Sequence, residues 1–354
     1  MRTLASILPQ GIKLALLKRH LVGSIDGERF RRELTLHDLP DKISPLRISL
    51  KKGNNEIAVG LDLEATMHRS DVYRMLYARL PSMLRVFSRS GSRIQMVAAD
   101  LSDGNAPPAG VMAFCSCRDD VLLVPDPVFV NSGGYAQFRD PTALPAWSHR
   151  HDTILWRGTS TGIGEMTTET MDPNDLRLRQ RVRMCLILRS KPGTDVRIHK
   201  AESVASALDR QRLHRLGLLG SYIAQAHWGR HKFALDIDGH TNAWSNFFVR
   251  LLLGCCVLKI QSEHGYRQWY YDRLKPWRHY VPVCADMSDL IEKIDWCRSH
   301  DAECELIGRA GQSVVQAMTV ETEIKDAVGR LEAAQFTATE GGLEHPRETP
   351  VVAP

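Results

Sequence analysis

The hydrophobic residues of this chain form short continuous runs that alternate with helical patterns. Residues 233–237 and 255–260 are apolar runs of strand length, and between them lie Asp238-Gly239, a polar turn and an amphipathic helix ending at Gly254. A strand, a glycine turn, a helix and a second strand make the βαβ unit of a parallel sheet, whose ligands bind beyond the carboxyl ends of the strands. We therefore expect a ligand at this turn, with Asp238 either accepting a ribose hydroxyl or capping the helix, and a phosphate at the helix N-terminus.

The same pattern predicts α/β organisation along the rest of the chain. The boundary between two domains is expected in the turn-rich segment 141–151, which gives domains at 1–150 and 151–335, and a polar tail, 336–354, predicted to be disordered. Strands are expected at 46–50, 57–61, 93–98, 111–115, 121–124, 153–156 and 196–199. Helices are expected at 4–21, 71–87, 176–188, 204–216, 289–298, 299–315 (broken near Gly308 or Gly311) and 319–331.

Composition indicates an ordinary globular protein and narrows its partners. Hydrophobic residues make up 43% of the chain, charged residues 25%, and the formal net charge is +5. Basic residues cluster at 13–19, 29–32 and 177–183. We interpret these clusters as solvated helix faces, or alternatively as a surface for anionic lipid or an anionic glycolipid. No basic run is interleaved with stacking aromatics, so nucleic acid is not an expected partner.

Apolar runs and cysteines indicate the compartment. No apolar run approaches the ~20 residues that span a bilayer, and the N-terminal segment lacks a clean signal-peptide core. The eight cysteines have no zinc-knuckle spacing and are expected to be reduced, mostly buried thiols. These features predict a cytoplasmic protein, with peripheral contact at the inner membrane as an additional expectation.

A second set of strand-end residues suits a phosphate. The expected strand at 153–156 runs directly into Arg157-Gly158-Thr159-Ser160-Thr161-Gly162, which presents a guanidinium and several hydroxyl donors. Such groups suit a diphosphate, although an Arg-Gly turn is also common in purely structural loops. The Asp236-x-Asp238 pair matches the DxD pattern of metal-dependent transferases. That pattern binds metal at the end of a strand, but Asp236 falls inside the expected strand. We therefore predict a site without metal.

Four blocks, taken in order, resemble a known family. They are ILWRGTSTG (154–162), DGHTNAWSNFFVRLLLGCCVLK (238–259), RLKPWRHYVPV (273–283) and DMSDLIEKIDW (286–296). Together they resemble glycosyltransferase family 90, which includes fungal capsule-associated proteins, animal protein O-glucosyl- and xylosyltransferases, and bacterial lipopolysaccharide-A-type enzymes. The second block is most similar to the bacterial branch.

The resemblance implies a fold and a reaction. The expected fold is α/β and GT-B-like, with two Rossmann-like domains facing a cleft and C-terminal helices crossing back to the first domain. The expected reaction is inverting, metal-independent transfer from a nucleotide sugar, a UDP-sugar, to a cell-surface glycan or glycolipid such as lipopolysaccharide or capsule. No cofactor beyond the UDP-sugar co-substrate is expected. The donor-binding residues that it implies are Arg157, Ser160, Thr161, Asp238, Gly239, Asn242, Trp244, Ser245, His279 and Tyr280. The alternative role for Trp244 is packing between strand and helix. The alternative role for His279 and Tyr280 is to brace a loop beside the cleft.

Inverting transfer needs one general base for the acceptor hydroxyl. Asp100 follows the expected strand at 93–98, in the place where the resembling family carries its catalytic aspartate, and Asp126, in a Pro-Asp-Pro turn, is the rival. Two other classes of function stay open. The first is a nucleotide-sugar-binding protein without a working base. The second is an α/β oxidoreductase, which the absence of a GxGxxG turn after any strand disfavours.

Overall fold

The computed structural model describes residues 9–25, 33–40, 42–54, 56–104, 110–202 and 205–334. They form two compact units. The first unit contains the chain up to Leu101, Gly110–Met112 and the residues from Asp326 onward, and the second contains the segment starting at Ser102 together with Ala113–Lys325. The boundary expected at 150 lies inside the second unit. The tail predicted to be disordered, 336–354, lies outside the described residues.

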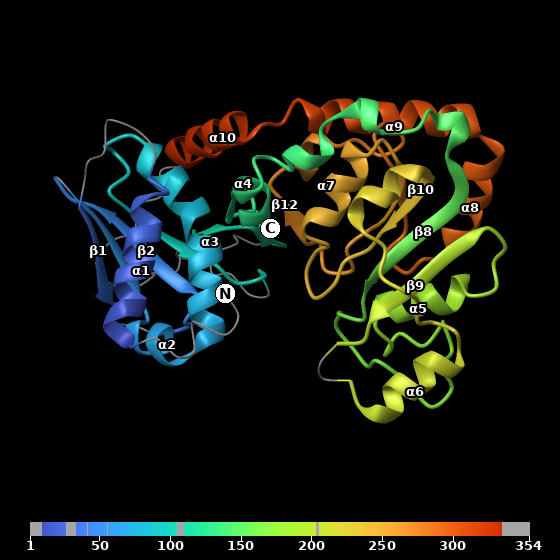
Figure 1. Cartoon of the computed structure of the whole chain (residues 1–354), viewed down its shortest axis with the longest axis horizontal. Helices are drawn as coiled ribbons and strands as arrows, with labels where there is room; N and C mark the ends of the chain where they lie inside the picture. The colour runs from blue at the N-terminus through green and yellow to red at the C-terminus, as the bar shows by residue number, and fades with distance from the viewer. Residues whose placement is uncertain are drawn as a thin grey trace, which may run out of the picture. The chain divides into compact units, whose positions relative to one another are not determined.

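The first unit is a mixed sheet with helices (blue in Figure 1). Its strands β1 to β4 are adjacent in the order β1-β3-β2-β4; β1 pairs parallel with β3, whereas β2 is antiparallel to both β3 and β4. The elements are α1 (Gln10–Val22), β1 (Glu33–Asp38), β2 (Arg47–Lys52), β3 (Glu56–Leu61), α2 (Leu63–His68), α3 (Ser70–Arg89) and β4 (Met96–Asp100).

The antiparallel pairs make the expectation of a Rossmann-like first domain wrong for these strands. Only three residues separate Lys52 from Glu56. A connection this short joins antiparallel strands only, because a parallel pair needs a crossover of a dozen residues or more.

The second unit is built on a five-stranded parallel sheet, which confirms the α/β class with parallel strands. The strand order is β13-β11-β10-β8-β9, and every adjacent pair is parallel. These strands are β8 (His151–Thr159), β9 (Thr194–Lys200), β10 (His231–Asp236), β11 (Cys256–Ile260) and β13 (Val281–Val283). The helices are α4 (Pro127–Asn131), α5 (Gln180–Leu188), α6 (Ala207–Arg215), α7 (Ser245–Leu252), α8 (Leu290–Ser299), α9 (Asp301–Gln316) and α10 (Val320–Ala333). Short strands are β5 (Met112–Ala113), which spans the division between the units, and β6 (Cys115–Ser116), β7 (Leu122–Leu123) and β12 (Arg267–Gln268).

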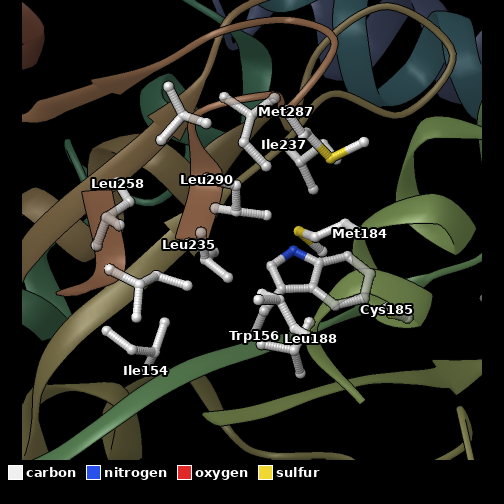
Figure 2. Packing of buried hydrophobic residues seen from close by; sticks show 14 of the residues in the cluster. Ile154, Trp156, Met184, Cys185, Leu188, Leu235, Ile237, Leu258, Met287 and Leu290 are labelled. Carbon is white, nitrogen blue, oxygen red and sulfur yellow. The ribbon is translucent and has the colours of Figure 1, made fainter. Parts of the chain in front are cut away.

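The core of the second unit lies between this sheet and its helices. Trp156 of β8 lies beside Met184 of α5, and Leu235 and Leu258 come from the central strands (Figure 2). Burying a side chain of this kind stabilises the fold by roughly 1.5–3 kcal/mol. All five residues of β11 are buried, as expected for a central parallel strand covered on both faces.

The predicted break near Gly308 or Gly311 is wrong, because α9 is continuous across both residues. The glycines serve close packing instead. A Cβ on Gly308 would lie 2.9 Å from the carbonyl oxygen of Gly254, and one on Gly311 would lie 2.5 Å from that of His279. Both positions therefore need glycine for α9 to approach its neighbours.

The C-terminal residues return to the first unit. The division between the units falls inside α10, and from Asp326 onward its residues belong to the first unit. There the Gly91 N–H donates to the Glu332 carboxylate at 2.7 Å. In the described part of the chain, no helix has both the length and the apolar character needed to cross a bilayer.

Candidate functional site

The strand order places a topological switch point between β8 and β10. From β8 the chain crosses to β9 on one side, and from β10 it crosses to β11 on the other. In open parallel sheets, the crevice where the connections diverge, at the carboxyl ends of the strands, is where ligands bind. Here that position is flanked by the loop after Thr159 and the loop after Asp236.

The loop after β8 is held by its own hydroxyl groups. Ser160 is fully buried, and its Oγ accepts the Glu202 N–H at 2.9 Å. The hydroxyl oxygens of Thr159 and Thr161 lie 3.1 Å apart, and Thr161 is partly exposed. Of the two hydroxyl residues predicted to contact the donor in this loop, Ser160 therefore shapes the loop, whereas Thr161 lies in its partly exposed part.

Arg157 is fully engaged inside the unit. Its NH2 group donates to both carboxylate oxygens of Asp195 at 2.7 Å, and its other donors reach the carbonyl oxygens of Trp156, Asp195 and Ser221. The side chain is 6% exposed. These contacts brace β8 against β9, so a phosphate would have to displace Asp195 to reach this guanidinium.

A buried group of four charges lies at the ends of β10 and β11. Lys259 Nζ is 2.9 Å from Asp236 Oδ2 and 3.0 Å from Asp238 Oδ1, and Arg250 NH1 is 2.8 Å from Asp236 Oδ1. Burial alone would lower the pKa of Lys259, but the two carboxylates raise it above its usual value. The two carboxylates therefore compensate two cations here, and the buried Arg181 interacts electrostatically with both carboxylates as well.

Two carboxylate oxygens of this group, Asp236 Oδ2 and Asp238 Oδ2, accept no hydrogen bond within the described residues, but Asp236 Oδ2 has Lys259 Nζ at 2.9 Å. Asp238 Oδ2 is buried and accepts no hydrogen bond from any residue in the described part of the chain. An unpartnered buried acceptor costs free energy unless a ligand or a water satisfies it. Asp238 thus has one oxygen held by Lys259 and the other available at the switch point.

Arg181, from α5, ties the two loops together and was missed as a functional residue. It donates to Thr161 Oγ1 at 2.7 Å and to the Asp238 carbonyl oxygen at 2.9 Å. Burial lowers the pKa of Arg181 to about 10, opposed by Asp236 and Asp238. A Cβ on Gly239 would lie 2.9 Å from Thr161 Oγ1, so the close approach of the two loops requires this glycine.

The interpretation of the basic cluster at 177–183 as a solvated or lipid-facing surface is wrong for three of its arginines. Arg179, Arg181 and Arg183 are 4–9% exposed, and each donates to backbone carbonyl oxygens. Backbone carbonyl groups satisfy these buried guanidinium groups, and Arg179 and Arg183 also contact the carboxylates of Glu202 and Glu263. The sequence did indicate this burial. All residues of 182–188 except Arg183 are apolar, which is typical of a buried helix.

The entrance to α7 has a constrained backbone. Trp244 has φ 50° and ψ −124°, outside the regions that non-glycine residues prefer. Its N–H donates to Asn242 Oδ1, and its ring lies 6.4 Å from that of Phe114. Trp244, the residue before α7, makes no side-chain capping bond to the helix, and the Asn246 N–H donates to the Ala243 carbonyl oxygen at 3.1 Å. Ser245, the first residue of the helix, is partly exposed and accepts from Gln225 Nε2 at 3.4 Å.

His279 and Tyr280 lie next to the far edge strand of the sheet, apart from the switch point. His279 Nδ1 accepts the Lys275 N–H at 3.0 Å, and the pKa of His279 is lowered by burial and by Arg278 and Lys275. The Tyr280 ring packs edge-on against Phe247 at 5.6 Å. Their contacts are those of a braced loop, and their donor-binding role stays a prediction.

The two candidate bases lie in different units. Asp100 is the last residue of β4 in the first unit, 8% exposed, in register with Arg47 of β2. Asp126 is 2% exposed, and its Oδ1 accepts the N–H groups of Val128 and Phe129 at 2.9 Å as the N-cap of α4. Burial raises the pKa of Asp126 despite these hydrogen bonds. Asp126 is thus a helix cap, and Asp100 stays the predicted base.

Comparison with known proteins identifies the family. Residues 136–329, more than half of the chain, match the sequence profile of Glycosyl transferase family 90. The chain belongs to this family. This match confirms the resemblance to glycosyltransferase family 90 that the sequence showed. It also confirms the prediction that the chain belongs to a family of glycosyltransferases.

Relatives of this family 90 chain match only part of it. An uncharacterised protein of Frog virus 3 is 30% identical over 238 residues (62% of this chain, 24% of the viral protein), and one of Invertebrate iridescent virus 3 is 30% identical over 208 residues (55% and 18%). Protein O-glucosyltransferase 2 of Danio rerio is 34% identical over 96 residues (27% and 19%). The chain thus spans less than a quarter of the length of these curated relatives.

Solved glycosyltransferase structures resemble the chain weakly. The C-terminal domain of a glycosyl transferase group 1 family protein from Francisella tularensis is 15% identical, with a TM-score of 0.31 over 48% of this chain and 88% of that domain. The Anabaena protein HepE in complex with UDP-glucose is 11% identical, with a TM-score of 0.33 over 60% of this chain and 54% of HepE.

Proposed function

We propose that this chain is a glycosyltransferase whose second unit binds a UDP-sugar at the switch point between β8 and β10. The observation that carries the proposal is the buried Asp238 Oδ2, which lacks a donor beside loops that Arg181 holds together. A carboxylate oxygen in this position suits a ribose hydroxyl. The uncapped N-terminus of α7 suits the diphosphate.

The proposed reaction does not use a divalent metal. A metal-dependent transferase needs carboxylates that are available to the ion, but Lys259 already bridges Asp236 and Asp238. The Lys259 ammonium therefore occupies the position between the two carboxylates that a metal ion would need. The charge of the leaving diphosphate would be stabilised by the N–H groups of α7 instead.

The proposed chemistry is inverting transfer. The acceptor hydroxyl oxygen attacks the anomeric carbon, the bond from that carbon to the diphosphate breaks, and the acceptor proton passes to a general base. Asp100 is the proposed base, because Asp126 is committed to capping α4. UDP leaves carrying the negative charge.

The proposed acceptor is a cell-surface glycan or glycolipid, such as lipopolysaccharide or capsule, modified in the bacterial cytoplasm or at the inner face of the inner membrane. The proposal of this acceptor is supported by residues 238–259, whose sequence is most similar to the bacterial branch of the family. The viral and animal relatives do not bear on this acceptor.

Calorimetric titration of UDP into the full chain, with and without a chelator, tests the donor site. We expect the same dissociation constant in both titrations, and a loss of about ten- to a hundredfold in Asp238→Asn, the effect of a lost charge-assisted hydrogen bond of roughly 1.5–3 kcal/mol. The control is Asp152→Asn, a carboxylate whose side chain is 75% exposed at the start of β8. Binding that disappears with chelator contradicts metal independence, and equal affinity in Asp238→Asn contradicts the assignment of the site.

A second candidate, a nucleotide-sugar-binding protein without transfer activity, is separated by turnover. Hydrolysis or transfer of a radiolabelled UDP-sugar, measured on the same preparation that binds UDP, supports the enzyme. Binding without release of UDP, across a panel of donors and acceptor lysates, supports the alternative.

A further inference from the structure

Three buried cysteines meet at the amino end of β11, the end of the strand opposite the proposed donor site. Cys256 is the first residue of β11, Cys297 lies near the end of α8, and Cys304 lies in the first turns of α9. Each is 0% exposed. Their three Sγ atoms all lie within 4.8 Å of one another, and no other group of three or more metal-ligating side chains in the described ranges does so.

The approach of α9 to β11 brings these sulfur atoms together. Gly308 lies one helical turn after Cys304, and a Cβ there would lie 3.2 Å from the backbone nitrogen of Cys256. A larger residue at this position would push α9 away from β11 and Cys304 away from Cys256. Three segments distant in sequence are thus packed so that their thiols converge on one point.

The geometry fits a metal ion. Thiolates around zinc at 2.3 Å are about 3.8 Å apart in tetrahedral geometry, so an ion would draw these sulfur atoms together by roughly 1 Å at most. Thiolate ligands select soft ions. The ligand atoms that lie together here are the three sulfur atoms, and the neighbouring His300 is not part of the group.

We propose that Cys256, Cys297 and Cys304 form a structural site for a divalent thiophilic cation of the zinc and cadmium class. Charge decides between ions, because three thiolates leave a net charge of −1 around a divalent ion and −2 around a monovalent one, and buried net charge is costly. Each cysteine loses its thiol proton to solvent as its metal–sulfur bond forms, and nothing is oxidised or reduced. The bound ion would fasten α8 and α9 to β11 and would take no part in sugar transfer.

Cadmium titration of the reduced, chelator-treated full chain tests this site. Cys117 and Cys284, the two exposed cysteines, are first replaced by serine so that they bind no ion. We expect one Cd²⁺ per chain by native mass spectrometry, a thiolate-to-cadmium charge-transfer band in the ultraviolet, and a higher melting temperature. Cys304→Ser should lose the band and the thermal gain.

The matched control is Cys185→Ser, because Cys185 is equally buried but lies in α5, apart from the three. It should keep the band, the stoichiometry and the thermal gain. Cys297→Ser provides a second variant if Cys304→Ser does not fold, and it should also lose the band. The proposal is overturned if the parent protein shows no band, if the band survives in the folded variants, or if cadmium binds without raising the melting temperature.

Discussion

Replacing Lys259 by methionine removes the cation between two buried carboxylates. Methionine keeps most of the length and the apolar stem of lysine but leaves Asp238 without its ion pair and Asp236 with Arg250 alone. Asp236, Asp238 and Lys259 have side chains 0–7% exposed, so solvent does not screen the change. Removing one partner of a buried ion pair typically costs about 3–5 kcal/mol, because the other charge is left buried and uncompensated.

This cost is large enough to measure in a protein of this size. A loss of 1 kcal/mol lowers the melting temperature of a domain of ~150–250 residues by roughly 2–4 °C, so Lys259→Met should lower it by about 6–20 °C. Lys232→Met is the matched control. Lys232 is also largely buried, but its partners Asp152 and Asp301 have side chains 75% and 50% exposed. A pair of this kind is worth about 0–1 kcal/mol, so the control should fall by less than about 4 °C.

The dependence on pH gives a second, independent readout. In the unchanged protein the pKa of Lys259 is raised, so its contribution is complete below the usual lysine pKa of about 10.4 and is lost only as the pH rises through the higher folded value. The ammonium contribution is therefore constant between about pH 5 and 8. In Lys259→Met, protonation of a carboxylate that has lost its ammonium partner removes the uncompensated charge, so the deficit should shrink as the pH falls from 8 to 5.

The assay is thermal or urea unfolding of both variants and the parent at pH 5, 6.5 and 8. The double variant Asp238→Asn/Lys259→Met, which removes the uncompensated carboxylate, should recover part of the loss. A deficit below about 1 kcal/mol for Lys259→Met, or a deficit independent of pH, would refute the interpretation of this group as a buried and mutually compensated ion cluster.

Four further substitutions separate binding, bracing and catalysis. Arg181→Met should weaken UDP binding about ten- to a hundredfold by releasing the two loops, as measured by calorimetry on folded protein. The sequence alone predicts that Arg157→Ala also weakens UDP binding. The contacts of Arg157 with Asp195 predict instead a lower melting temperature, with unchanged UDP affinity of the folded protein. Reduced UDP affinity at unchanged stability would support the sequence-based prediction. Asp100→Asn should lower transfer by roughly 10²–10⁴-fold while sparing UDP binding. Asp126→Asn should instead change stability little, because asparagine caps a helix about as well as aspartate, and loss of transfer in Asp126→Asn alone would make Asp126 the base.

Local sequence determined most elements of the second unit. The apolar runs 233–237 and 255–260 are β10 and β11 within one or two residues, because a strand covered on both faces needs a continuous apolar run. The same alternation of strands and helices predicted a parallel sheet correctly. In the first unit, strands were predicted at 46–50 and 57–61, but their antiparallel pairing was not, because it follows from the length of one connection rather than from the strands themselves.

Charged residues show what the sequence did not determine. Arg157, Arg181 and Lys259 are all basic residues in the sequence, but they have different roles. Arg157 braces two strands, Arg181 connects two loops, and Lys259 pairs with two carboxylates. Which carbonyl and carboxylate groups surround a cation depends on residues tens of positions away, brought together only when the sheet forms. The same holds for Cys256, Cys297 and Cys304, whose spacing indicates no site. The sequence by itself therefore determined the elements and the turn that carries Asp238, whereas tertiary structure decided which polar groups are compensated internally and which remain available to a ligand.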